Sequence, residues 1–178
     1  MIPSRRVTRP PLVVVFVAVL MLALGASAGA VMSKLRPETQ KYARARIAAN
    51  PAAHGLAGNA EYDDEVIARA VFTAEAGLSF FHTHAQGIPA IVLLAGTIVA
   101  TCVPRRAARA TLHALLAAGG LFPLGYLVYA LAVLETGRDT GVTLAERWVL
   151  TPLGTLVILG LLGLTVTLAS AISASRPR

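Results

Sequence analysis

The chain contains four long apolar runs, and these constrain its fold more than any other feature of the sequence. They cover about residues 11–32, 78–103, 110–134 and 148–172. At a helical rise of 1.5 Å per residue, each run is long enough to cross a hydrocarbon core of roughly 30 Å. A hydrophobic fraction of 56% agrees with this interpretation. The sequence therefore predicts an all-α integral membrane protein, a four-helix bundle forming a single membrane domain over residues 1–178.

Charged residues are sorted to opposite sides of the four predicted spans. Half of the basic residues, and no acid, lie before the first span, between the second and third, and after the fourth (Arg5, Arg6, Arg9, Arg105, Arg106, Arg109, Arg176 and Arg178). Lys and Arg in short loops are retained on the cytoplasmic side. We therefore predict that both termini are cytoplasmic and that residues 33–77 form an external helical segment. The net charge of +7 then reflects topology in a lipid bilayer, and it does not indicate nucleic-acid binding.

The first span has a second interpretation. Arg5 and Arg6, the apolar core and the small residues at 26–28 also fit a secretory signal peptide. The apolar length of about 22 residues, however, exceeds the roughly 7–15 residues usual for such a core. We therefore expect an uncleaved anchor, and cleavage would leave three spans with the N-terminus outside.

The external segment is expected to contain two helices. Asn59 is a typical helix N-cap, and the acids that follow it favour a helix start. From there, apolar residues recur every four positions on one helical face (Tyr62, Val66, Ala70, Ala74 and Leu78). This stripe is expected to pack on the bundle or to lie in the membrane interface, and we expect it to dock a partner.

His82 and His84 follow this stripe and form the strongest candidate for chemistry. Helical rise places both at the outer membrane boundary. Glu75 lies seven residues before His82 and therefore on the same helical face. Pro89 is expected to kink the helix and to free a backbone carbonyl beside the histidines. Imidazole with a carboxylate or a carbonyl suits zinc or copper, so His82, His84 and Glu75 are the candidate metal ligands.

The spacing of the two histidines opposes a shared site. Side chains two residues apart point about 160° apart on a regular helix, so only an unwound turn would bring both imidazoles to one ion. The alternative is that the two histidines hydrogen-bond to neighbouring helices, to headgroups or to a partner subunit.

Haem is the third cofactor that the histidines suggest. Bis-histidine ligation needs two imidazoles at one depth, but His113 lies at the opposite end of its span from His82 and His84. A single axial histidine, or a ligand shared with a partner chain, stays open. His113 is expected to be an interior hydrogen-bonding residue or a headgroup contact, and His54 would approach the outer site from the external turn.

The third span carries small residues and a proline near its centre (Gly119, Gly120, Pro123 and Gly125). These predict a kink and a notch where a neighbouring helix approaches closely. Tyr126 and Tyr129 lie one turn apart above the notch. They either donate hydrogen bonds into a cavity containing His82 or belong to the outer aromatic belt.

The helix with His82 and His84, together with residues 119–126, resembles small uncharacterised bacterial membrane proteins with a His-x-His helix motif. That set is distantly similar to helices of respiratory oxidase-type subunits. The likeness covers roughly residues 80–163, and Gln86-Gly87 replaces the expected leucine-glycine pair. The resemblance implies a respiratory or metal-linked context and assigns no ligand.

The chain carries no Walker sequence, nucleophile elbow, HExxH or CxxC motif, so an enzymatic function is not favoured. We expect a non-catalytic integral subunit of a bacterial inner-membrane complex, of a respiratory or electron-transfer kind, that packs on other membrane subunits through Gly- and Ala-rich helices. Two alternatives stay open. One is a metal- or haem-binding protein at the periplasmic face. The other is a permease for small solutes or metals, with a polar path formed by three threonines and two tyrosines (Thr97, Thr101, Thr111, Tyr126 and Tyr129).

Overall fold

The computed structural model describes residues 7–174, and all regular structure in this range is helical. The elements are α1 (Leu12–Lys34), α2 (Arg36–Ala48), α3 (Pro51–His54), α4 (Ala60–Cys102), α5 (Arg106–Gly119), α6 (Leu124–Thr136), α7 (Arg138–Ala145), the π-helical turn η1 (Glu146–Leu150) and α8 (Thr151–Ala174). Within the described range, four helical stretches are long and apolar enough to cross a membrane: Leu12–Lys34, Ala60–Cys102, Arg106–Thr136 and Arg138–Ala174. The predicted all-α fold is confirmed, and so is the prediction of four helices long and apolar enough to span a membrane.

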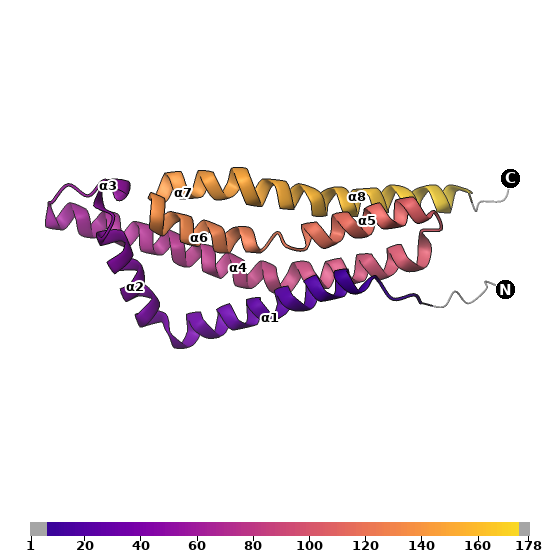
Figure 1. Cartoon of the computed structure of the whole chain (residues 1–178), viewed down its shortest axis with the longest axis horizontal. Coiled ribbons are helices and arrows are strands. Elements are labelled where there is room, and N and C mark those ends of the chain that lie inside the picture. Colours follow the sequence, from indigo (N-terminus) through magenta and orange to yellow (C-terminus); the bar gives the residue numbers. More distant parts are fainter. Residues whose placement is uncertain (1–6, 175–178) are drawn as a thin grey trace.

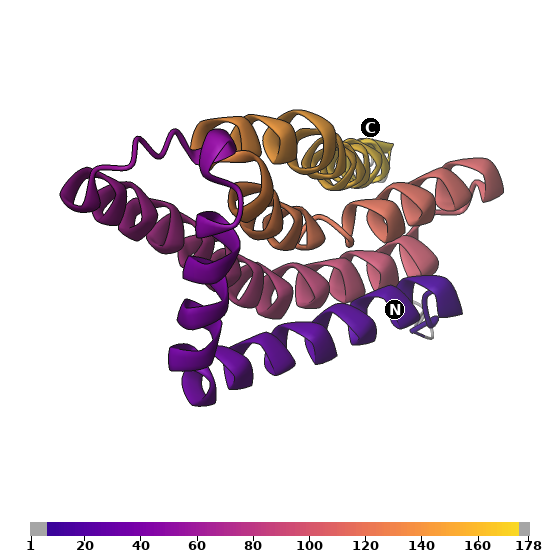
Figure 2. The same ribbon diagram turned by 60° about the vertical axis from the view of Figure 1, so that its left-hand side comes forward.

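The helices are arranged around α4. Helices α1 and α6 lie along α4, and α8 packs on α5 (Figure 1). The start of α1, the α4–α5 connection and the end of α8 lie together, and we call this the arginine end because Arg9, Arg105, Arg106 and Arg109 are found there. The opposite end is the cap end, where α2 crosses from α1 to α4 and α6 (Figure 2). Four other arginines of the predicted cytoplasmic set, at positions 5, 6, 176 and 178, lie outside the described residues.

Helix α4 extends from the predicted second span into the external segment without a break. The side chain of Asn59 accepts hydrogen bonds from the backbone amides of Glu61 and Tyr62, both at 3.1 Å, so the predicted N-cap is present. With 43 residues, α4 measures about 65 Å, roughly twice the hydrocarbon thickness. About half of α4 therefore extends beyond any hydrocarbon layer that the bundle spans.

The third span is interrupted where the small residues and the proline predict it. Helix α5 ends at Gly119, and α6 begins at Leu124 after a turn over residues 120–123. Pro123 has no amide hydrogen, and its ring conflicts with the carbonyl four residues earlier, so a regular helix cannot continue through this point. Phe122 N and Leu124 N bond to carbonyls three residues back instead.

The fourth helical stretch begins ten residues before the predicted span at 148. Gly137 ends α6 with φ +86°, and α7 starts directly after it at Arg138. Helix α7, η1 and α8 then run on from one another to Ala174. The apolar run did not reveal this start, because residues 138–147 are helical but include four charged side chains.

Two apolar clusters hold the bundle together. The first joins all four spans through buried side chains that include Val14, Val92, Leu116 and Val157. The second joins α2, α4 and α6 at the cap end and includes Ile47, Ala70, Ala74 and Val133. The predicted stripe is therefore divided: Ala70 and Ala74 are buried in the second cluster, whereas Tyr62 is 51% exposed.

Close helix contact in the first cluster depends on glycine. A Cβ added to Gly119 would overlap the backbone nitrogen and Cα of Val157 in α8, whereas nothing lies within 4 Å of a Cβ added to Gly87. Backbone atoms cannot move aside as a flexible side chain does, so α5 and α8 would have to separate. The two glycines therefore differ in packing although both are helical.

Gly119→Ala is expected to destabilise the protein by about 1–3 kcal/mol, the usual cost of overpacking. Gly87→Ala is the matched control, and it should be neutral or stabilising by roughly 0.5–1 kcal/mol because alanine favours helix. Thermal unfolding in detergent, followed by circular dichroism, measures both. Equal unfolding midpoints for the two variants would contradict the α5–α8 contact.

Candidate functional site

His82 faces α1. Its Nδ1–H donates to the carbonyl oxygen of Gly25 at 2.8 Å. The ring also lies against Gly29, where an added Cβ would be 2.6 Å from His82 Cε1. Gln86, one turn further along α4, donates to the carbonyl of Leu22 at 3.2 Å. His82 and Gln86 thus bind two successive turns of α1, and small residues on α1 make room for the imidazole.

His84 faces α6 and belongs to an aromatic cluster. Its ring centroid lies 4.6 Å from that of Tyr126 and 5.7 Å from that of Phe122. Phe80 contacts both His84 and Tyr126. The Nδ1–H of His84 donates to the carbonyl oxygen of Phe80 at 2.8 Å. Tyr126, expected near His82, therefore stacks on the other histidine.

Glu75, the third predicted ligand, is bound to α2. Its Oε1 accepts from Gln40 Nε2 at 2.7 Å, and its Oε2 pairs with Arg36 at 3.5 Å. The three predicted ligands thus have three different sets of partners. Among the residues that the structure describes, no group of three or more His, Cys, Asp or Glu side chains converges to hold a metal ion.

The regular course of α4 explains why the histidines diverge. The helix continues through Pro89 without a change of secondary structure, so the unwound turn that a shared site requires does not form. Proline at this position removes one backbone hydrogen bond, but packing retains the helix, since Ala85 and Pro89 are both buried.

The two remaining histidines also bind backbone carbonyls. His113 is 7% exposed, and its Nε2–H donates to the carbonyl of Gly96 at 3.1 Å, as expected for an interior hydrogen-bonding residue. His54 does not contact His82 or His84. It is buried in α3, and its Nε2–H donates to the carbonyl of Leu134 at 3.0 Å.

The threonines of the predicted solute path have local roles. The Thr97 hydroxyl donates to the carbonyl of Leu93 in its own helix. The Thr101 hydroxyl oxygen accepts from the backbone amide of Thr8 at 3.0 Å. Thr111 is exposed on α5. These contacts satisfy hydrogen-bonding groups of the helices and give no support to a polar path.

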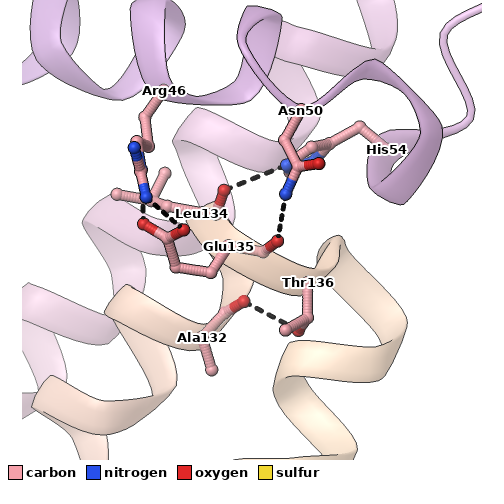
Figure 3. A network of polar contacts seen from close by, with 7 residues as sticks. All are labelled: Arg46, Asn50, His54, Ala132, Leu134, Glu135 and Thr136. Atoms are coloured by element: carbon pink, nitrogen blue, oxygen red, sulfur yellow. Dashed lines mark hydrogen bonds and ion pairs between the residues drawn. The ribbon is translucent and has the colours of Figure 1, made fainter.

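A polar network joins α2 and α3 to the end of α6 (Figure 3). It was not predicted from the sequence. Arg46 forms two bonds to the carboxylate of Glu135, at 2.6 and 2.7 Å. Asn50 donates to the carbonyl oxygen of Glu135 at 2.8 Å, beside the bond from His54 to Leu134. The hydrogen bonds to Glu135 raise the pKa of Arg46, so the guanidinium stays charged. We call α2, α3 and residues 60–77 of α4 the cap.

Two further contacts attach the cap. Arg44 of α2 pairs with Asp64 of α4 at 2.9 Å. The turn at Gly137 fits against α3 so closely that a Cβ there would overlap the carbonyl oxygen of Ala53. Together with the bonds of Glu75 and Glu135, these contacts fix the cap against both α4 and α6.

A groove runs between the outer part of α4 and α7. Three adjoining hollows make up this groove. Their lining residues include Val66, Arg69, Phe72, Thr73, Arg138 and Val142. Phe72 is 72% exposed at the rim of this α4–α7 groove. By helical rise, Phe72 lies about 45 Å from the α4 terminus at the arginine end, beyond a hydrocarbon layer of roughly 30 Å. For a hydrocarbon layer that begins at the arginine end, the Phe72 ring is therefore presented outside the membrane.

No family model, no curated protein and no solved structure matches the chain. The resemblance of residues 80–163 to oxidase-type subunits therefore stays a prediction.

Removing the Glu135 carboxylate is expected to loosen the cap and leave the bundle folded, because Arg46 then loses both bonds to α6. Glu135→Ala should speed amide hydrogen exchange in residues 36–54 while exchange in α5 and α8 stays unchanged. Asp139→Ala, which removes a nearby carboxylate without an ion pair among the described residues, is the control. Unchanged exchange in residues 36–54 of Glu135→Ala would show that the network does not hold the cap.

Proposed function

We propose that this chain is a non-catalytic integral subunit of a bacterial inner-membrane complex and that the α4–α7 groove binds a partner subunit. The observation that carries the proposal is Phe72, an exposed aromatic side chain beyond the membrane-spanning part of a cap that several polar contacts hold rigid. Aromatic side chains that fill a partner's pocket dominate the energetics of protein interfaces.

The rigid cap supports docking because its geometry is set before any partner binds. Arg46 with Glu135, Arg44 with Asp64, and Gln40 with Glu75 connect α2 to both α6 and α4. A surface that is already ordered loses little conformational entropy on association. Phe72 is the most exposed aromatic side chain of the cap, at 72%.

The membrane-spanning helices support a second kind of contact within the bilayer. In the most apolar windows of the first and fourth spans, only 28% and 17% of residues are buried inside this chain. Exposed apolar residues on these helices include Phe16, Leu24, Ile158 and Leu162. Such faces suit lipid and the helices of other membrane subunits equally.

The orientation belongs to the same proposal. Arg9, Arg105, Arg106 and Arg109 lie at one end of the bundle, and basic residues in short connections are retained in the cytoplasm. The arginine end is then cytoplasmic, and the cap end faces the periplasm. A docking partner would accordingly be a periplasmic domain or the external part of a neighbouring membrane subunit.

Replacing Phe72 tests the docking proposal. Phe72→Asp should release the chain from its complex, because losing one buried Phe costs about 1.5–3 kcal/mol, at least a tenfold loss of affinity. Blue-native electrophoresis of membranes from the producing bacterium measures the complex, and membrane insertion should not change. Tyr42→Asp alters an exposed aromatic residue of α2 outside the groove and should leave the complex intact.

Tyr62→Asp extends the test to the exposed end of the predicted stripe, and release by this variant as well would enlarge the docking surface toward the start of α4. Two outcomes oppose the proposal. One is a wild-type chain that migrates alone, and the other is a Phe72→Asp chain that stays in the complex.

A specific observation favours a second candidate, a metal or haem ligand at His84. Its Nδ1–H donates to the Phe80 carbonyl, and ligating histidines usually orient their second nitrogen in this way. The free Nε2 would then serve as a single ligand to copper, zinc or a haem iron beside Tyr126. His82 does not share this site, because its ring lies against Gly25 and Gly29 of α1.

Oxidised and reduced absorption spectra of the purified protein, with elemental analysis of the same sample, test this candidate. It predicts a Soret band or one equivalent of metal that is lost in His84→Ala and kept in His82→Ala. A colourless, metal-free wild-type protein eliminates it.

A further inference from the structure

A hollow of about 520 Å³ lies at the arginine end, between the segment that precedes α1 and the start of α5. Its lining includes Arg9, Arg106, Arg109 and His113 on the polar side. The amide of Thr8 donates to the Thr101 hydroxyl oxygen and so holds the segment before α1 over the end of α4. The volume falls within the range of ligand sites, roughly 300–1,000 Å³.

The positive charge of this hollow is not balanced by ion pairs among the residues that the structure describes. Arg9, Arg106 and Arg109 form no ion pair with any residue in the described range 7–174. The sequence has no acid before Glu38 and none between Glu75 and Glu135. Three guanidinium groups around one hollow repel each other, and an anion between them would relieve that repulsion.

The backbone adds donors at the same place. The first amides of any helix have no helical acceptor, and at the start of α5 no side chain caps them. Such amides and the helix dipole favour an anionic group. Arginine forks bind phosphate oxygens with two parallel bonds, so a phosphate fits these donors better than a carboxylate of the same charge.

The other wall of the hollow is apolar, and this favours a phosphate group that carries an acyl chain. Pro10, Pro11, Leu12 and Ala110 line it. Leu12 is 72% exposed, and Phe16, one turn further into the membrane, is 64% exposed. These side chains form an apolar strip that leads from the arginines along α1 toward the bilayer centre. A free phosphate would leave this strip uncovered, whereas an acyl chain attached to the phosphate would cover it.

We propose that the hollow at the arginine end is a binding site for one anionic phospholipid. The headgroup phosphate accepts hydrogen bonds from Arg106 and Arg109 at the start of α5 and from Arg9, which precedes α1. The acyl chain lies along Leu12 and Phe16 of α1. Basic pockets between membrane helices bind anionic headgroups by the same chemistry. The site is separate from the groove at the cap end and does not depend on the proposed docking function.

Native mass spectrometry of the detergent-solubilised full chain tests the site. The probes are dioleoyl phosphatidylglycerol and dioleoyl phosphatidylcholine, which share acyl chains and differ in net charge. The wild type should retain one phosphatidylglycerol at concentrations where phosphatidylcholine is not retained. Arg106→Gln/Arg109→Gln should weaken retention about 30-fold, which corresponds to about 2 kcal/mol for two arginines.

Arg105→Gln is the matched control, since it removes the same charge from the same connection but lies outside the hollow. It should retain phosphatidylglycerol as the wild type does, whereas Arg109→Gln alone should lose about fivefold. Circular dichroism and gel filtration of each variant verify that it is folded. Equal retention of the two lipids, or equal effects of Arg105→Gln and Arg109→Gln, would overturn the proposal.

Inorganic phosphate separates the two sources of the anion. At 10 mM it should not displace phosphatidylglycerol, because it makes no contact with Leu12 and Phe16. Displacement by inorganic phosphate would mean that the hollow binds a soluble anion, and the lipid proposal would then fail.

Discussion

The continuous helical course of α4, from Ala60 to Cys102, is the constraint on which the rest of the structure depends. A membrane-spanning segment must satisfy its own amide and carbonyl groups, and a helix does this without help from neighbours. Helix α4 extends the same pattern beyond the hydrocarbon, so the cap and the membrane bundle share one rigid element. Its continuity also keeps His82 and His84 on different faces, one against α1 and the other against α6.

Three of the four histidines connect neighbouring helices. His54, His82 and His113 each donate to a carbonyl of a different helix, at Leu134, Gly25 and Gly96. In a low-dielectric interior such bonds fix which turn of one helix meets which turn of another. His84 differs because its bond stays within α4, to Phe80, and its ring lies among aromatic side chains. This difference is why one histidine, and not the pair, carries the cofactor alternative.

Local sequence patterns predicted the parts of the fold that local physics determines. Apolar length identified four spans, Asn59 identified the start of α4, and Pro123 with its glycines identified the interruption of the third span. The cap network could not be predicted in this way, because Arg46 and Glu135 are 89 residues apart. The aromatic cluster could not be predicted for the same reason. Tyr126 and His84 lie on different helices, and only helix packing decides which of the two histidines Tyr126 contacts.

The two ends of the molecule treat charge in opposite ways, and this decides what each end offers to its surroundings. At the cap end, Glu75, Asp64 and Glu135 each pair with an arginine of α2, so opposite charges cancel within the chain. At the arginine end no acid is near in the sequence, and the guanidinium groups stay unmatched in the described residues. Internal pairing favours recognition through apolar contact at the cap. Unmatched arginine beside apolar surface favours an anion that carries its own hydrocarbon.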